Sequence, residues 1–400
     1  MASPPGRSNS VRENAIWLPF WALLLGGVNV HFAGREPQLL YADVILFLLL
    51  LYLALWEGFY PSLKDWIPKL GAFVILSGVL SALVNYRDVY RSIDALKILG
   101  VGLLVYAIAK KTPIGLLTLS LWGAIAGILL LGNYQALRYG EYEGVAGLKD
   151  EIGIVLGRSN YVASMLLILI PLSVASVSIH KGKKRWLCAG CAMLMLGGLV
   201  ATMSRGAMLA LVLATILSVP LLYKAGMRTK HAAIVALVLA LVVALLPSDL
   251  LATNVALFAY RLDNPDLTRE EIMKASWETF KENPVLGIGP GQLGPAIAHH
   301  VIVPMYGGIY YNAHNLILDA LAEDGLPAGL ALLTMVGIVL WKALNALLAQ
   351  PNPLNAAVWL GLLAAVLHNM VEASFEGQQF QYVFWAVAAM AGRNWNVGGS

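Results

Sequence analysis

The chain has 400 residues, of which 59% are hydrophobic and only 12% are charged. Soluble domains carry about 25% charged residues, so this composition excludes a single water-exposed globule. The net charge of +4 is spread over short loops. It therefore does not indicate a nucleic-acid-binding surface, which needs a clustered basic patch.

Apolar runs long enough to cross a bilayer recur along the whole chain. About 20 apolar residues in a helix cross about 30 Å of hydrocarbon. We therefore predict an all-α, polytopic membrane protein, with residues 1–400 forming a single integral membrane domain of about twelve transmembrane helices. The predicted spans are 15–33, 39–58, 66–84, 92–109, 113–133, 159–179, 186–203, 206–223, 231–247, 315–347, 354–370 and 379–392. The tenth is too long for one crossing, so we expect its first part, to about 325–327, to lie at the outer surface or to re-enter.

Three features inside the apolar runs have a structural interpretation. The first run, 15–32, is full length and another span follows at once, which favours a retained span over a cleaved signal peptide. Cys188 and Cys191 lie within an apolar run, whereas a redox motif needs an accessible helix start. We expect them to be small lipid- or helix-facing residues. Asp94 and Lys97 are spaced for a local ion pair on one helix.

The distribution of Lys and Arg predicts the orientation, because these residues concentrate in cytoplasmic loops. The clusters KGKKR at 181–185 and KAGMRTK at 224–230 fall on the same side under one count of spans. We therefore expect both termini in the cytoplasm and the segments 134–158 and 248–314 outside. The second is long enough to build a site above the membrane, and loops of this length are usually functional.

Within residues 248–314, the sequence predicts a short amphipathic helix. Thr268 and Glu271 have the spacing of a capping box, and Pro284 would end the helix. The apolar residues at helical spacing are Ile272, Met273, Trp277 and Phe280. Such a helix suits the surface of a membrane.

Two residues near the outer face are the first candidates for chemistry. His314 lies where the long loop re-enters the membrane, and an imidazole can take a proton from a sugar hydroxyl at neutral pH. The alternative is an interfacial histidine that bonds a loop carbonyl. Arg205 lies in a tight turn between two spans, where a guanidinium is costly unless it faces a cavity or a partner. It could hold a phosphate or reach lipid headgroups.

The start of the amphipathic helix offers a second anion site. Arg269 lies in its first turn, with Arg261 one segment earlier, and a helix N-terminus adds amide donors. Each could instead be a solvated charge. The GIGPG sequence at 287–291 contains Gly289 and Gly291 but follows no β-strand, so it is not a dinucleotide-binding fingerprint. It favours a tight turn, with a phosphate-binding nest as the alternative.

Acidic residues gather at the outer ends of the last spans and could bind sugar hydroxyls or pair with the arginines. They are Glu323, Asp324, Glu372 and Glu376, and His368 precedes the last two. No DxD motif and no His/Asp cluster has metal-ligand spacing, which favours a metal-independent mechanism. We assign supporting roles to Glu323, Asn315, Gly289 and Gly291.

The stretch 205–329 resembles the O-antigen ligase and polymerase superfamily of bacterial membrane glycosyltransferases. The resemblance rests on SRGA at 204–207, the Arg-led helix start at 269–277, NPVLGIGPG at 283–291 and AHNLILDALAEDGLPAG at 313–329. It implies a helical fold similar to the GT-C class, a periplasmic site and a polyprenyl-linked donor without a nucleotide-sugar cofactor. It also implies that His314 is essential and that Arg205 and Arg269 hold a diphosphate. Met273 stands where the family commonly has Trp, and Trp277 can fill similar space.

Within the superfamily, a ligase is the favoured function. It would transfer O-antigen from undecaprenyl diphosphate to a sugar of the lipid A core at the periplasmic face of the bacterial inner membrane, in lipopolysaccharide biosynthesis. A polymerase or a protein O-oligosaccharyltransferase would share the same motifs. A transporter or flippase of an anionic lipid-linked glycan is the alternative from another class. Transporters place charges near the midplane, whereas here they gather at the outer surface.

Overall fold

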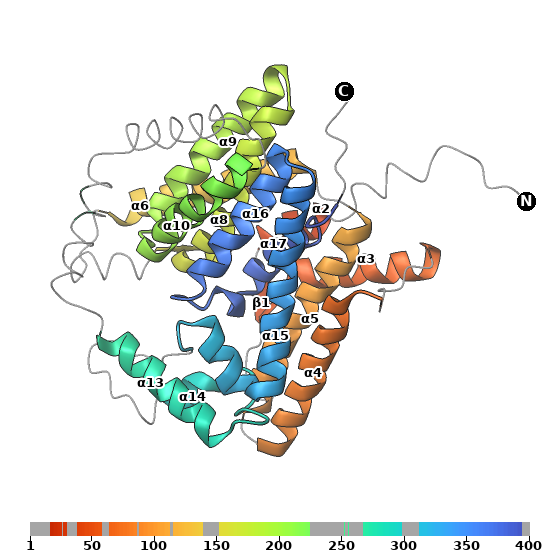
Figure 1. The fold of residues 1–400 in the computed structure, drawn as a ribbon, viewed down its shortest axis with the longest axis vertical. Coiled ribbons are helices and arrows are strands. Elements are labelled where there is room, and N and C mark those ends of the chain that lie inside the picture. The colour runs from red at the N-terminus through yellow and green to blue at the C-terminus, as the bar shows by residue number, and fades with distance from the viewer. Residues whose placement is uncertain are drawn as a thin grey trace, which may run out of the picture.

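The computed structural model describes residues 17–25, 27–29, 38–57, 64–85, 88–112, 115–138, 152–224, 252, 255, 267–297 and 312–393. The protein is built almost entirely from helices (Figure 1). They are α2 (Trp17–Leu23), α3 (Tyr41–Glu57), α4 (Trp66–Asn85), α5 (Val89–Lys111), α6 (Leu116–Leu137), α8 (Ser159–Ile179), α9 (Gly182–Ala201), α10 (Arg205–Lys224), α13 (Leu267–Glu282), α14 (Leu293–Ile297), α15 (Leu316–Ala349), α16 (Pro353–His368), the 3-10 turn η1 (Ser374–Glu376) and α17 (Gln378–Ala388). Two short antiparallel pairs join β1 (Gly27–Asn29) to β2 (Gln38–Leu40) and β3 (Gly153–Ile154) to β4 (Gly157–Arg158).

Among the described residues, seven helices are long and apolar enough to cross a membrane: α4, α5, α6, α8, α9, α10 and α15. The helices α3 and α16 are apolar but shorter. The prediction of a mostly helical membrane protein is therefore confirmed, whereas the full set of twelve spans is not. The predicted span 231–247 and the candidate Arg261 lie outside the described residues.

Two predicted spans differ from the structure. In place of a continuous helix over 15–33, α2 ends at Leu23 and Gly27–Asn29 forms a strand. The adjacent glycines at 26–27 explain this break, because glycine is a poor helix former. In place of 379–392, α17 has 11 residues and is followed by turns. A helix of that length rises only about 16 Å, roughly half the hydrocarbon thickness.

The helix α8 forms the centre of the bundle. Its apolar window is 78% buried within the protein, compared with 28% for α4 and for α10. Beside it, α6 and α9 approach closely, because a Cβ atom on Gly198 would lie 2.5 Å from the Cα of Gly127. Small residues allow such backbone contact between membrane helices. Cys188 and Cys191 are free and buried in α9, which agrees with the prediction of helix-facing small residues.

The long helix α15 is two helices joined by a break. Gly325 has φ +71° and ψ 178°, outside the helical region. A Cβ atom at Gly325 would lie 2.2 Å from the carbonyl oxygen of Val285, so the break is also a point of close backbone contact. The predicted interruption of this span is confirmed. Figure 1 shows the first part of α15 beside α13 and α14 at the bottom of the view, with the second part rising through the bundle.

The bundle has two chemically distinct ends. At one, Asp65 accepts hydrogen bonds from Tyr106 Oη (2.7 Å), Lys110 Nζ (2.6 Å) and Lys342 Nζ (3.0 Å). Burial alone would raise the pKa of Asp65, but these hydrogen bonds hold it well below its usual range. At the other end of α4, Asn85 Nδ2 donates to the carbonyl of Gly287 at 3.1 Å. The 20 residues of α4 rise about 30 Å, so these contacts lie about a bilayer's thickness apart.

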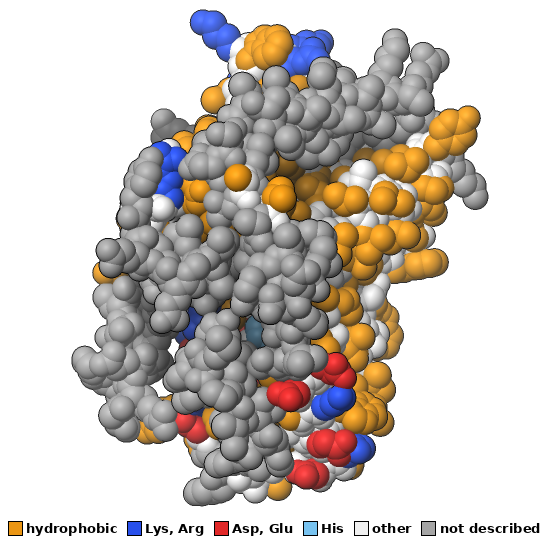
Figure 2. All heavy atoms as spheres, turned by 90° about the vertical axis from the view of Figure 1, so that its left-hand side faces the viewer, with side chains coloured by type: hydrophobic (Ala, Val, Ile, Leu, Met, Phe, Trp, Pro, Cys, Tyr) orange, Lys and Arg blue, Asp and Glu red, His pale blue; other side chains and the backbone are white. Residues whose placement is uncertain are grey.

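The basic turn between α8 and α9 lies at the Asp65 end. The first turn of α8 carries Asn160, which contacts the α16–α17 connection, so the other end of α8 leads away from that connection. The turn that follows contains Lys181, Lys183, Lys184 and Arg185. Figure 2 shows Lys and Arg side chains at the top of the molecule, hydrophobic side chains along the described flank, and mixed charges at the bottom.

Candidate functional site

The connection between α16 and α17, residues 369–377, gathers side chains from distant parts of the chain. Its Glu372 is only 5% exposed. One carboxylate oxygen accepts a hydrogen bond from His314 Nδ1 at 3.0 Å. The other accepts from Asn160 Nδ2 at 2.5 Å and lies 3.7 Å from Arg269 Nη2. Glu372 thus joins α8, α13 and the turn that precedes α15.

The charge of Glu372 determines which ring nitrogen of His314 carries the proton in the neutral imidazole. Burial alone would raise the pKa of Glu372, but the hydrogen bond and charge of His314 and the charges of Arg269 and His368 lower it to about 2. An ionised carboxylate can only accept hydrogen bonds, so His314 must donate through Nδ1–H. In the neutral imidazole this leaves Nε2 as the nitrogen that can accept a proton.

His314 has an unusual backbone conformation. Its φ of +51° lies in the left-handed region, which side chains other than glycine rarely adopt and which costs about 1–3 kcal/mol. Two hydrogen bonds hold the turn in place: His314 N–H donates to Asn312 Oδ1 at 3.1 Å, and Ala313 N–H donates to Asp319 Oδ1 at 2.6 Å. The surrounding structure therefore fixes the direction of the imidazole.

Asn315 attaches this turn to both of its neighbours. Its side-chain oxygen caps α15 by accepting from the N–H groups of Ile317 and Leu318. Its Nδ2 donates to the carbonyl of Met370 at 2.9 Å, inside the α16–α17 connection. The position of His314 relative to Glu372 is thus set by a second, independent contact.

Arg269 lies in the first turn of α13 and reaches the same connection. Besides its ion pair with Glu372, its Nη1 donates to the carbonyl of Val371 at 3.2 Å. The predicted helix is confirmed over Leu267–Glu282, but its apolar residues are divided between two environments. Ile272 is fully buried against the protein, whereas Trp277 is 45% exposed.

The start of α10 packs beside the same connection and carries Arg205. The residue before Arg205 is Ser204, whose Oγ lies 3.3 Å from His368 Nε2. On the other side of the ring, Ser164 Oγ lies 2.6 Å from His368 Nδ1. A Cβ atom on Gly206 would lie 3.2 Å from Cγ2 of Val371. The buried His368 therefore ties α8, α10 and α16 together next to Glu372.

The glycine-rich turn at 287–291 is bonded to Glu323 of α15. Gly289 N–H donates to the Glu323 carbonyl at 3.0 Å, and Gly291 N–H donates to its carboxylate at 2.8 Å. The other carboxylate oxygen accepts from Leu293 N–H at 3.0 Å. Since these amides already have an acceptor, the arrangement favours a tight turn over a phosphate nest.

The structure brings Arg205, Arg269, His314 and Asn315 to one connection, while Glu323, Gly289 and Gly291 form a neighbouring support. The described ranges contain no group of three or more His, Cys, Asp or Glu side chains suited to a metal ion. Sequence reasoning missed Asn160 and Ser164. Their signal was polarity inside the apolar run 159–179, because polar groups in a membrane helix need a partner.

The segment that contains these residues matches a known family. Residues 190–333 match the family model described as O-antigen ligase. Through this segment, the chain is similar to the O-antigen ligase family. Comparison with curated proteins gives no match. This match confirms the expected resemblance to the O-antigen ligase family.

Proposed function

We propose that this protein transfers O-antigen glycan from undecaprenyl diphosphate to a sugar of the lipid A core, at the periplasmic face of the bacterial inner membrane. The family match supports the class of reaction. The observation that carries the proposal is the convergence at Glu372: His314 and Arg269 bond to it, and the start of α10 packs beside it. An imidazole next to a guanidinium group suits a reaction between a hydroxyl group and a diphosphate ester.

In the proposed mechanism, Arg205 and Arg269 bind the donor diphosphate, with Arg261 as a further ligand. They stabilise the negative charge that develops as the bond between the anomeric carbon and the diphosphate oxygen breaks. His314 Nε2 takes the proton of the acceptor hydroxyl, whose oxygen attacks the anomeric carbon from the opposite side. One glycosidic bond forms, undecaprenyl diphosphate leaves, and the anomeric configuration is inverted. The guanidinium groups supply the positive charge, so the mechanism requires no metal ion and no cofactor.

The two ends of the bundle support a periplasmic site. The Lys-rich α8–α9 turn and the cluster around Asp65 lie at the end opposite His314. Because Lys and Arg concentrate on the cytoplasmic side, this polarity supports a periplasmic position for the His314 end.

The test is reconstitution of the full chain with undecaprenyl-diphosphate glycan and lipid A core. We expect glycan on lipid A, and we expect His314→Asn to lower the rate about 10²–10⁴-fold. Asn suits the test because it tolerates the left-handed backbone at this position. Arg205→Ala should lower the rate about 10²–10³-fold. Glu278→Gln, an exposed change on α13, is the control and should keep the wild-type rate.

The same assay separates the alternatives. A lengthened donor in place of glycosylated lipid A would indicate a polymerase, and glycosylated protein a protein-modifying enzyme. Movement of donor across the bilayer without a covalent product would indicate a flippase. A folded His314→Asn protein with the wild-type rate would remove the proposed base.

A further inference from the structure

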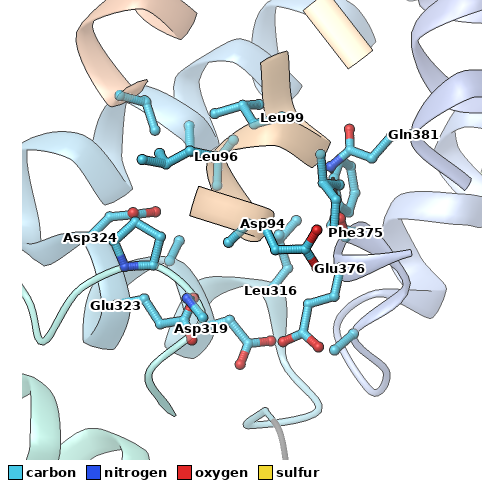
Figure 3. A pocket seen from close by; sticks show the side chains of 18 of the residues that line it. Asp94, Leu96, Leu99, Leu316, Asp319, Glu323, Asp324, Phe375, Glu376 and Gln381 are labelled. Atoms are coloured by element: carbon cyan, nitrogen blue, oxygen red, sulfur yellow. Dashed lines mark hydrogen bonds between the residues drawn. The ribbon is translucent and has the colours of Figure 1, made fainter. Parts of the chain in front are cut away.

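A cavity of about 270 Å³ lies between α5, the start of α15, the glycine-rich turn and the α16–α17 connection (Figure 3). Its volume is near the lower end of the range for small-ligand pockets, about 300–1,000 Å³. The carboxyl groups that line it are Asp94, Asp319, Glu323, Asp324 and Glu376. Its apolar wall includes Leu96, Leu99, Leu316 and Phe375. The cavity therefore combines hydrogen-bonding groups with an apolar surface and has room for a small ligand.

The cavity shares its wall with the turn that carries His314. Asp319, which lines the cavity, accepts the N–H of Ala313 at 2.6 Å. Glu376, which also lines the cavity, accepts from Asn312 Nδ2 at 3.0 Å. A ligand in this cavity would thus lie directly against the turn that positions the proposed base.

Asp324 marks the cavity as more than a cluster of acidic side chains. The residue is only 9% exposed, and within the described part of the chain it has no hydrogen bond and no ion pair. Figure 3 shows its carboxyl group directed into the cavity. Its carboxyl group is open to the cavity, and a largely buried polar group that makes no hydrogen bond to the protein is energetically costly. The neighbouring Glu323, by contrast, has both oxygens bonded to backbone N–H groups. The unpaired carboxyl group therefore points to a ligand that supplies hydrogen-bond donors.

The chemistry of the cavity selects the kind of ligand. Hydroxyl groups can bond to a carboxyl group in either protonation state, because a carboxylate accepts and a carboxylic acid also donates. Burial, together with the charges of Asp319 and Glu323, raises the pKa of Glu376 well above its usual range, which favours the protonated form that can donate a hydrogen bond. Arg91 is the one basic residue among the lining residues, and it is ion-paired with Asp88. Such a lining disfavours a phosphate group.

We propose that this cavity binds an uncharged sugar residue of the acceptor, with Asp324 as a hydrogen-bond partner of its hydroxyl groups. The donor diphosphate is then held on the side of the α16–α17 connection where Arg269 lies. The acceptor sugar occupies the carboxyl-lined cavity on the other side of that connection. The acceptor sugar then lies beside the turn that carries His314, through the contacts of Asp319 and Glu376 with that turn. This inference rests on the proposed transfer reaction and adds the site of its second substrate.

The test uses the full-length protein in nanodiscs and two independent readouts. Binding of radiolabelled rough lipopolysaccharide is measured without donor, and transfer kinetics are measured by varying each substrate in turn. Asp324→Leu removes the carboxyl group at similar size. We expect its acceptor KM and the affinity for rough lipopolysaccharide to worsen by about 10-fold, which corresponds to one lost hydrogen bond. The donor KM should stay unchanged, and thermal stability should stay equal or rise because a buried unpaired group has been removed.

Asp324→Asn is the second variant, for the case that leucine prevents folding, because asparagine keeps the polarity and shape of the side chain. We expect a smaller loss of acceptor affinity than for leucine. Glu278→Gln is the matched control away from the cavity. Wild-type acceptor affinity in both folded Asp324 variants would overturn the proposal, as would an equal loss of donor affinity. If the wild-type protein binds rough lipopolysaccharide through Asp324 but forms no product, the transfer reaction fails and the sugar site stands.

Discussion

Glu372 is the residue on which the geometry of the candidate site depends most. Its two oxygens receive hydrogen bonds from two different donors, His314 Nδ1 and Asn160 Nδ2. A carboxylate accepts both, whereas a carboxamide has only one oxygen and presents an NH₂ group on its other side. The negative charge also stabilises the imidazolium that forms when the proposed base takes a proton.

We therefore predict that Glu372→Gln lowers kcat with little change in donor KM. Gln must present NH₂ either to His314 or to Asn160, so the tautomer or the orientation of the imidazole changes. The loss should reach about 10²-fold, within the full contribution of roughly 10²–10⁴ expected for a general base. Steady-state kinetics in proteoliposomes measure it. A variant that folds and keeps its kcat would contradict the positioning role.

The lowered pKa of Glu372 predicts a pH dependence of stability. Its pKa falls from about 4.5 to about 2 in the folded protein. The ionised form is therefore stabilised by folding, on the order of 3 kcal/mol by linkage. This contribution is present above about pH 4.5 and is lost as the pH falls toward 2. Thermal unfolding in detergent should show wild type above Glu372→Gln at pH 6, with the gap closing below pH 4.5. Glu278→Gln should follow wild type throughout, and a gap that is constant with pH would refute the prediction.

At the scale of elements, the break in α15 divides this helix between the candidate site and the membrane bundle. The glycine-rich turn packs against the break, so that a Cβ atom on Gly287 would lie 2.2 Å from the carbonyl oxygen of Glu323. Leu326 N–H donates to the carbonyl of Pro284 at 2.8 Å. The first part of α15 thus belongs to the site, and the second part belongs to the bundle.

Gly325→Ala should destabilise the protein by at least about 2 kcal/mol, because Ala would hold a left-handed backbone and meet the Val285 carbonyl. Gly337→Ala is the control on the same helix. A Cβ atom there meets nothing within 4 Å, so the change should be neutral or stabilise by up to about 1 kcal/mol. Thermal unfolding of the two variants gives the comparison, and equal stabilities would argue against a rigid break.

At the scale of the whole molecule, the helix directions separate the Glu372 end from the basic end. Helix α8 begins at the site with Asn160, and α16 ends there with His368. Lys110 and Lys342 meet Asp65 about 30 Å away, at the other end of the bundle. We expect the basic end to face the cytoplasm, because Lys and Arg concentrate on that side of the membrane.

This orientation predicts the labelling of single cysteines introduced into a Cys188→Ala, Cys191→Ala background. In right-side-out spheroplasts, a membrane-impermeant maleimide should react with Glu278→Cys on α13. It should react with Lys183→Cys only after permeabilisation. The reverse pattern would put the site in the cytosol and would exclude a periplasmic transfer reaction.

Sequence periodicity and composition determined the helical membrane class, most helix positions and the break near Gly325, because hydrocarbon demands long apolar helices with satisfied backbones. The tight turn at Arg205 and the helix at Arg269 also followed from local signals. The short α2 did not follow, since hydropathy alone does not reveal that the helix stops at Leu23 and that a strand pairing follows.

Only the tertiary structure decided which polar residues meet. Glu372 and His314 are 58 residues apart, and Asn160 is 212 residues from Glu372, so no local pattern pairs them. The same holds for the unpaired Asp324, whose exposure to a cavity depends on α5 and the α16–α17 connection packing around it. Local sequence fixes the helices, because their hydrogen bonds are local. The site is built from contacts between helices, and these depend on how all of the helices pack together.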